Sequence, residues 1–259
     1  HGRTLGALST TAEPGYRAPF APLLDVTFVS PDDPAAVEAA LTDEVAALIV
    51  EPIQGEGGVW PLSNDVAEAI TAGCRRSGTL LIADEIQCGL GRTGVAFHSA
   101  TLGLEPDLMS LGKALGGGVP IGAVLMSQAV ADAVSPGDHG TTYGGNLLSC
   151  RAALVFLDML EHGGLERIRA AGDRLGQGLE AIVGRHNVVR EVRGAGLMRG
   201  VVMTEEAAIA VVAGAQERRL LVNRTGGNVV RMLPPLTVSD SEIDQALDIL
   251  EQSLAAYAG

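Results

Sequence analysis

The 259-residue sequence predicts an α/β fold with a mostly parallel sheet in a large domain, followed by a smaller α+β domain. Short apolar runs alternate with helix-like stretches, and the runs are V-A-A-L-I-V (45–50), T-L-L-I-A (79–83), D-L-M-S-L (107–111) and I-G-A-V-L-M (121–126). Each run has the length and composition of a buried strand. The 34 glycines and the low aromatic content of 3% also suit an α/β fold with many close backbone approaches.

Two helices are predicted with clear boundaries. Ser63 stands where an N-cap is expected, and the helix after it should run to about Ser77 and end at Gly78. Near the end of the chain, Ser239 and Glu242 have the spacing of a capping box, in which each residue satisfies a backbone N–H of the other. A final helix should therefore begin there.

The pattern changes after about residue 146, where long helical stretches replace the alternation. The predicted elements are a helix from about 146, an amphipathic helix over 164–184, strands near 190–203 and 229–233, and the final helix. Residues 1–33 are rich in proline and are predicted to be mainly loop. We therefore expect a large cofactor-binding domain over residues 1–160 and a small C-terminal domain over residues 161–259.

Composition and charge exclude several function classes. The net charge of −13 argues against nucleic-acid binding, which needs a basic face. No apolar run reaches the roughly 18 residues of a membrane span, so a membrane protein is not expected. The three cysteines are widely spaced and match no metal-binding pattern; they indicate a reducing compartment, and hence the cytoplasm, without a metal site. The mean hydropathy of +0.26 predicts apolar surface in a subunit interface or against further chain.

Charged side chains follow two of the predicted strands. Asp84 and Glu85 end the run L-L-I-A-D-E, and Lys113 follows the next run, just before three consecutive glycines. Ligands bind at the carboxyl ends of strands in open parallel sheets, so these groups are predicted to share a site. Taken singly, the acids are equally well read as helix caps or solvent-facing residues, and Lys113 as a surface residue in a flexible turn.

An acid and an amine at one sheet edge suit pyridoxal phosphate. That cofactor needs a lysine for a Schiff base and an acid against its pyridinium nitrogen, which keeps the ring able to accept carbanion electrons. The lysine must be neutral to react, and burial lowers a lysine pKa from about 10.4. Lys113 and Asp84 fit both demands. A G-x-G-x-x-G pattern at Gly89, Gly91 and Gly94 is weak evidence for a dinucleotide, because no acid follows at the spacing that a ribose needs.

Six motifs occur in order along nearly the whole chain. They are H-G-R-T-L-G-A-L-S, E-P-I-Q-G-E-G-G-V, A-D-E-I-Q-C-G-L-G-R-T-G, L-G-K-A-L-G-G-G-V-P-I-G-A, H-G-T-T-Y-G-G-N and V-R-G-A-G-L-M-R-G. Together they resemble the class III (ornithine-type) aminotransferases, and within that family the acetylornithine branch. The resemblance implies the type I pyridoxal-phosphate transferase fold, pyridoxal 5'-phosphate as cofactor, and a homodimer with shared active sites.

The resemblance also implies roles for individual cofactor-binding residues. Lys113 would form the Schiff base and move the proton between substrate and cofactor, while Asp84 would pair with the pyridine nitrogen. Ile86 would pack against the ring, and Gln87 would hydrogen-bond its phenolic oxygen. Thr142 would bind the phosphate of the neighbouring subunit's cofactor, although alone it would be read as a turn hydroxyl.

Three charged residues would bind substrate, again by resemblance. Arg3 matches the arginine that holds the α-carboxylate of an ornithine-type donor. Arg231 matches the arginine that holds the carboxylate of 2-oxoglutarate or glutamate, since a guanidinium binds a planar carboxylate through two parallel hydrogen bonds. Glu56 matches the acid that neutralises Arg231 during the other half-reaction. The alternatives are a permanent ion pair between Glu56 and Arg231, and a loop role for Arg3.

The expected reaction is transfer of the distal amine of N-acetylornithine to 2-oxoglutarate, giving glutamate, in arginine biosynthesis. Other distal-amine donors remain open, namely ornithine, succinyldiaminopimelate, 4-aminobutyrate and a carrier-linked lysine. A second alternative is a non-catalytic fragment of such an enzyme, because the family's phosphate loop and stacking aromatic are expected upstream of His1. Two residues depart from the family pattern, Cys88 where threonine is usual and Leu147 where proline is usual.

Overall fold

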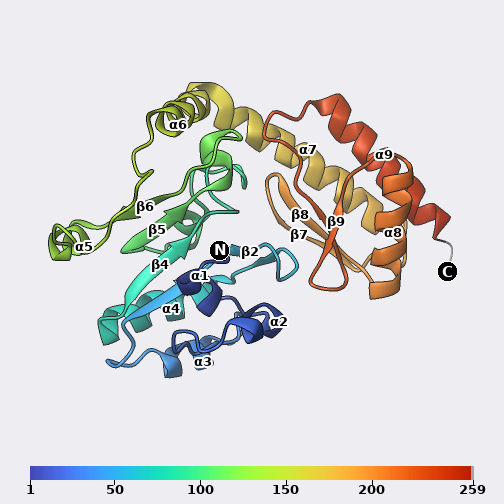
Figure 1. The fold of residues 1–259 in the computed structure, drawn as a ribbon. Coiled ribbons are helices and arrows are strands. Elements are labelled where there is room, and N and C mark those ends of the chain that lie inside the picture. The colour runs from blue at the N-terminus through green and yellow to red at the C-terminus, as the bar shows by residue number, and fades with distance from the viewer. Residues whose placement is uncertain (258–259) are drawn as a thin grey trace.

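The computed structural model describes residues 1–257 and contains two sheets flanked by helices (Figure 1). The first sheet has the order β1-β4-β5-β6, with β1 (Ala47–Val50), β4 (Leu80–Asp84), β5 (Leu108–Leu111) and β6 (Ala123–Met126). Strands β1, β4 and β5 run parallel, and β6 runs antiparallel to β5. The predicted α/β class is therefore confirmed, and the four strands start within two residues of their predicted positions.

The second sheet is antiparallel and has the order β7-β8-β10-β9. Its strands are β7 (Glu191–Ala195), β8 (Met198–Val202), β9 (Asn223–Thr225) and β10 (Val229–Met232). A two-stranded ribbon, β2 (Ile53–Gln54) and β3 (Trp60–Pro61), leaves the first sheet, and β3 contacts β7 of the second. Figure 1 shows this ribbon between the two sheets, so its connecting loop can join groups from both.

Helices surround both sheets in the described part of the chain. They are α1 (Leu5–Ser9), α2 (Pro14–Arg17), α3 (Pro34–Ala40), α4 (Asn64–Ser77), α5 (Gln128–Ala133), α6 (Leu147–Met159), α7 (Leu165–Val183), α8 (Glu205–Glu217) and α9 (Asp240–Ala256). Short 3₁₀ turns lie at Ala18–Phe20, His98–Leu102 and Lys113–Gly116, and a π turn lies at Leu160–Gly164. None of the helices between residues 1 and 257 is long and apolar enough to cross a membrane.

Both predicted caps are present. The Ser63 hydroxyl accepts a hydrogen bond from the Val66 N–H, and Gly78 ends α4 in the left-handed region at φ 76°. The capping box of Ser239 and Glu242 begins α9. These local signals were sufficient because each cap satisfies backbone groups of its own helix and needs no distant partner.

The main core lies between the second sheet and helices α7, α8 and α9. Leu175 and Leu179 of α7 pack with Val230 of β10 and with Leu250 of α9, and all four are almost fully buried. A second core joins α3 and α4 to β4. A smaller third core at the β2–β3 ribbon contains Ile53, Val59, Cys88 and Met198.

The predicted secondary structure differs from the observed one in two respects. The strands expected near 190–203 are the hairpin β7–β8, but α8 and β9 were not predicted. Strands β1 and β6 are not buried: they form the two edges of the first sheet, and Val124 of β6 is 55% exposed. An apolar run in the sequence cannot distinguish such an edge strand from a buried central strand, because both are rich in apolar residues. The domain division at residue 160 stays a prediction; the chain bends nearby, at Gly163, with φ 89°.

Candidate active site

The acid of the candidate site is Asp84, the last residue of β4. Its side chain is only 2% exposed, and its Oδ1 accepts a hydrogen bond from the Ile86 N–H at 3.2 Å. Asp84 is the register partner of Ser110 on β5, so the two side chains project from the same face of the sheet. The Ser110 hydroxyl is buried without a hydrogen-bond partner among the described residues. A polar ligand bound beside Asp84 would satisfy such a hydroxyl.

The amine of the site is Lys113, which directly follows β5 and Gly112. It is the only lysine in the 259-residue sequence, so every other basic chain is an arginine or a histidine. Its φ of 44° lies in the left-handed region, which is uncommon for a residue with a Cβ. Strained backbone of this kind is concentrated at functional sites, where the surrounding structure imposes it.

The protein around Lys113 lowers the pKa of its amine. Its Nζ lies 2.7 Å from Nε2 of His1, and the side chain remains accessible from outside. Partial burial lowers the pKa of Lys113, and the nearby carboxylates of Glu51, Glu56 and Asp84 oppose that shift without reversing it. The amine is therefore closer to the reactive, uncharged state than an ordinary lysine.

The second group of polar residues is centred on Arg231 in β10. This side chain is 8% exposed, and its Nη1 donates to Glu56 Oε1 at 2.8 Å and to Gln87 Oε1 at 3.3 Å. Its Nε donates to Asn223 Oδ1 at 3.3 Å. Burial acts to raise the pKa of Glu56, but the hydrogen bond and charge of Arg231 outweigh it and lower that pKa. The pair is therefore ionised, and it links the second sheet to the loop of the β2–β3 ribbon.

The loop that carries Glu56 is held on both sides. The Glu51 Oε2 accepts the Gly55 N–H at 3.0 Å, and the Thr225 hydroxyl donates to the carbonyl oxygens of Gly55 and Glu56. A Cβ on Gly55 would lie 1.3 Å from Oε1 of Gln87, so only glycine fits this position while Gln87 stays in place. The loop backbone thus sets the positions of both Glu56 and Gln87.

Sequence analysis assigned no role to Glu51, Thr225 or Gly55, although Glu51 and Gly55 lie within the quoted E-P-I-Q-G-E-G-G motif. Burial raises the pKa of Glu51, the Gly55 N–H opposes that rise, and the charge of Asp84 adds to it. Lys113 is also marked in the sequence by being its only lysine.

Of the remaining predicted residues, Ile86 lies beside the first group, and Arg3 and Thr142 lie apart from both groups. Ile86 packs beside Gly112, since a Cβ on that glycine would lie 3.6 Å from the Ile86 Cγ2. Arg3 is exposed and its guanidinium stacks on the Tyr16 ring at 3.6 Å. Thr142 lies in the exposed segment 134–148 and makes no side-chain hydrogen bond within the described chain. The structure therefore brings together Lys113 with Asp84 and Ile86, and Arg231 with Glu56 and Gln87, but not Arg3 or Thr142; the roles of all eight stay predictions.

Comparison with known proteins adds a family to this geometry. The model of the family "Aminotransferase class-III" matches residues 1–254. An acetylornithine aminotransferase of Streptomyces coelicolor is 45% identical over 265 residues, covering 100% of this chain and 63% of that protein. A mitochondrial acetylornithine aminotransferase of Alnus glutinosa is 43% identical, covering 99% of this chain and 57% of that protein. The chain therefore spans about three fifths of these relatives.

Solved structures agree with the same fold. An ornithine aminotransferase from Toxoplasma gondii, described with partial occupancy of pyridoxal phosphate at its active site, has a TM-score of 0.91 and 36% identity, covering 98% of this chain and 62% of that one. An acetylornithine aminotransferase from Elizabethkingia anophelis has a TM-score of 0.81 and 32% identity, covering 90% and 60%. The predicted type I pyridoxal-phosphate fold is confirmed by these neighbours.

Proposed function

Because the chain belongs to the class III aminotransferases, which depend on pyridoxal 5'-phosphate, we propose that its protein moves the distal amine of N-acetylornithine to 2-oxoglutarate, giving glutamate, as a step of arginine biosynthesis. The observation that carries the proposal is the Glu56–Arg231 pair beside Gln87. An arginine that is neutralised by a nearby acid suits a site that accepts first an amine donor without a carboxylate at that point, and then a dicarboxylate. The acetylornithine aminotransferases among its relatives, at 41–45% identity, support this choice of donor.

The residues present fit the cofactor. Lys113 offers an amine with a lowered pKa, and Asp84 offers a carboxylate in a nearly solvent-free position at the end of β4. The unpartnered hydroxyl of Ser110 indicates that this part of the site accommodates a further polar group. Ile86 would lie against a ring face and Gln87 beside its phenolic oxygen. When bound, the cofactor supplies a ring that accepts the electrons of a substrate carbanion.

The chain's own residues then divide the work. Lys113 would hold the cofactor through its amine, and when that amine is free its Nζ would move a proton between the donor carbon and the cofactor. Asp84 would stabilise a proton on the cofactor's ring nitrogen, because its carboxylate is already in position before the reaction begins. Arg231 orients the dicarboxylate through paired N–H groups, and Glu56 neutralises Arg231 when the amine donor is bound. We assign Arg3 to the α-carboxylate of that donor.

The assembly and location follow the same proposal. A homodimer would place Thr142 of one protomer at the cofactor phosphate of the other, and the exposed position of Thr142 supports such a contact. Large apolar side chains near it, at Leu147 and Leu148, are 86% and 72% exposed and suit a subunit interface. We keep the large domain at residues 1–160, the small domain at 161–259 and a cytoplasmic location as parts of the proposal.

Single-turnover absorbance tests the function. Protein loaded with pyridoxal phosphate is mixed with N-acetylornithine, ornithine, succinyldiaminopimelate, 4-aminobutyrate or glutamate in turn, and the loss of the yellow band is followed. N-acetylornithine should react fastest among the distal-amine donors, and 2-oxoglutarate should restore the band. Faster reaction with ornithine, the substrate named for the Toxoplasma gondii neighbour, would replace the donor. A protein that takes up no cofactor would instead support a non-catalytic role.

A further inference from the structure

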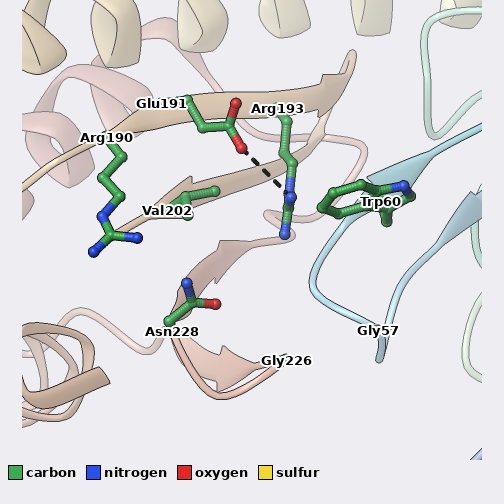
Figure 2. Close-up of a pocket in the computed structure, with 8 residues that line it drawn as sticks. All are labelled: Gly57, Trp60, Arg190, Glu191, Arg193, Val202, Gly226 and Asn228. Atoms are coloured by element: carbon green, nitrogen blue, oxygen red, sulfur yellow. Dashed lines mark hydrogen bonds and ion pairs between the residues drawn. The ribbon is translucent and has the colours of Figure 1, made fainter. Parts of the chain in front are cut away.

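A cavity of about 430 Å³ lies between the β2–β3 ribbon and the second sheet. Its lining comes from three parts of the chain: the ribbon, the strands β7 and β8, and the turn between β9 and β10. The residues are Gly57, Trp60, Arg190, Glu191, Arg193, Val202, Gly226 and Asn228. Figure 2 shows the two arginines on either side of Val202, with the Trp60 ring beside Arg193.

The two arginines differ in how they are held. Arg193 donates from Nε to the Gly58 carbonyl at 2.9 Å, its guanidinium lies 4.2 Å from the Trp60 ring centre, and its Nη1 is 3.4 Å from Glu191. Arg190 is exposed, and its side chain has no hydrogen bond or ion pair with any of residues 1–257. The cavity therefore contains one positioned guanidinium and one free guanidinium, against a single carboxylate that already faces Arg193.

These groups select the chemistry of a ligand. In a chain with a net charge of −13, two guanidinium groups around one hollow form a local positive site. Arginine binds carboxylates through planar, paired N–H groups. The indole of Trp60 and the side chain of Val202 offer apolar surface between and beside those groups, and the Asn228 amide adds a polar contact. A small carboxylate with a short apolar body matches all of these features.

Part of the cavity wall belongs to the loop that carries Glu56, between β2 and β3. Gly57 and Gly226 line it and touch each other: a Cβ on Gly226 would lie 2.9 Å from the Gly57 carbonyl oxygen. Thr225, the neighbour of Gly226, hydrogen-bonds the carbonyl of Glu56, whose carboxylate meets Arg231. A ligand that presses on Gly57 and Gly226 therefore acts on the backbone that positions Glu56, the acid of the Glu56–Arg231 pair.

We propose that this cavity binds a small carboxylate between Arg190 and Arg193, and that its binding changes how tightly Glu56 holds Arg231. The first half concerns a binding site separate from the cofactor site. The second half rests on the proposed aminotransferase function, because it concerns the balance between the two half-reactions.

Trp60 provides a direct measurement of the binding half, since it is the only tryptophan in the sequence and lines the cavity. Its emission is followed while butyrate is added at constant ionic strength. Butylamine has the same apolar body without the anion, and inorganic phosphate tests the other common anion. The variant Arg190→Gln removes the free guanidinium, and Arg75→Gln is the matched control, because Arg75 is exposed and pairs with Glu105 elsewhere.

Butyrate should give a saturable change in emission, and butylamine should give none. Losing a charge-assisted hydrogen bond weakens binding about tenfold or more, so Arg190→Gln should raise the Kd by that factor while Arg75→Gln leaves it unchanged. No saturable change, an equal Kd in Arg190→Gln, or a change lost only in Arg231→Gln would overturn the site. Tighter binding of phosphate than of butyrate would overturn the assignment to carboxylates.

The coupling half has its own readout. The ratio of the two half-reaction rates should shift at least about twofold on adding butyrate to the unaltered protein, and not in Arg190→Gln. An equal shift in both proteins would mean that butyrate acts at Arg231, and no shift in either would overturn the coupling. If the protein transaminates none of the donors, the fluorescence result still decides the binding half.

Discussion

Replacing Glu56 with alanine should change which substrates the site prefers. In the structure, Glu56 Oε1 accepts one hydrogen bond from Arg231 Nη1 at 2.8 Å, and Arg231 is otherwise held by the neutral side chains of Gln87 and Asn223. Arg231 is 8% exposed, so removing Glu56 leaves a nearly buried cation without its counter-charge. A substrate carboxylate could then bind Arg231 without first displacing the carboxylate of Glu56.

The size of the effect follows from the exposure of the pair. A hydrogen bond to a charged group contributes about 1.5–3 kcal/mol. The Glu56 side chain is 64% exposed, and solvent screening reduces the contribution of so accessible a partner to about 1 kcal/mol, the upper end for exposed pairs. At about 1.4 kcal/mol for each tenfold change, glutamate should bind roughly fivefold more tightly to Glu56→Ala. The distal-amine donor should bind more weakly, because the charge of Arg231 is then not neutralised by Glu56.

Stopped-flow absorbance of the cofactor-loaded protein measures both half-reactions separately. The ratio of kcat/KM for glutamate to that for N-acetylornithine should rise in Glu56→Ala, and by less in Glu56→Gln, which keeps an acceptor oxygen without the charge. Glu105→Ala is the matched control, because it removes an exposed glutamate from an ion pair with Arg75. An unchanged ratio in Glu56→Ala would show that the pair is a permanent structural contact, which is the alternative left open by the sequence.

Three further changes test the rest of the site. After the protein is loaded with pyridoxal phosphate and reduced with borohydride, the label should map to the Lys113 peptide, and a label elsewhere contradicts the assignment. Because the pKa of Lys113 is lowered, the rate of cofactor capture should rise with pH, with a midpoint below about 10.4. Asp84→Asn should retain cofactor more than turnover, with kcat reduced about 10²-fold or beyond, equal to roughly 3 kcal/mol of barrier, and a near-normal kcat refutes its role. Gly55→Ala should displace Gln87 and reduce kcat/KM, while the free energy of unfolding changes by about 1 kcal/mol or less. Gly184→Ala is its control, because a Cβ at that position meets nothing within 4 Å. Equal activity in the two variants contradicts the argument that the loop backbone positions Gln87.

The parts of the fold that were predictable depend on contacts close in sequence. The caps at Ser63 and Ser239 bond to their own helices, and the central strands β4 and β5 have apolar runs because helices or neighbouring strands cover them. The strands expected near 190–203 are β7 and β8, joined by a turn at Gly196. Strand β9 has only three residues and is stabilised by pairing with β10. Local periodicity in the sequence does not reveal such a pairing.

The candidate site divides in a similar way. Lys113 and Asp84 could be paired from the sequence because each follows a strand and the strands are neighbours in a parallel sheet. The Glu56–Arg231 pair joins residues 175 positions apart, and only the resemblance connected them in advance. The support from Glu51 and Thr225 was not predictable, since it consists of side chains bonding to the loop backbone, and such bonds leave no pattern in composition or spacing.

The two adjacent acids show why a strand end has to be located before a role is assigned. Asp84 and Glu85 are both buried, at 2% and 0% exposed, so burial alone does not decide which of them faces the site. Successive side chains of a strand point to opposite faces, so only one of them can face the site. Asp84 lies in register with Ser110, while the Glu85 carboxylate accepts the Ser99 N–H at 2.6 Å and the Cys88 thiol, whose pKa is raised by burial and by the charge of Glu85. Glu85 therefore stabilises the turn after β4, and that turn carries Ile86 and Gln87 into the site, so the proposal assigns the chemistry to Asp84, while Glu85 supports the backbone of that turn.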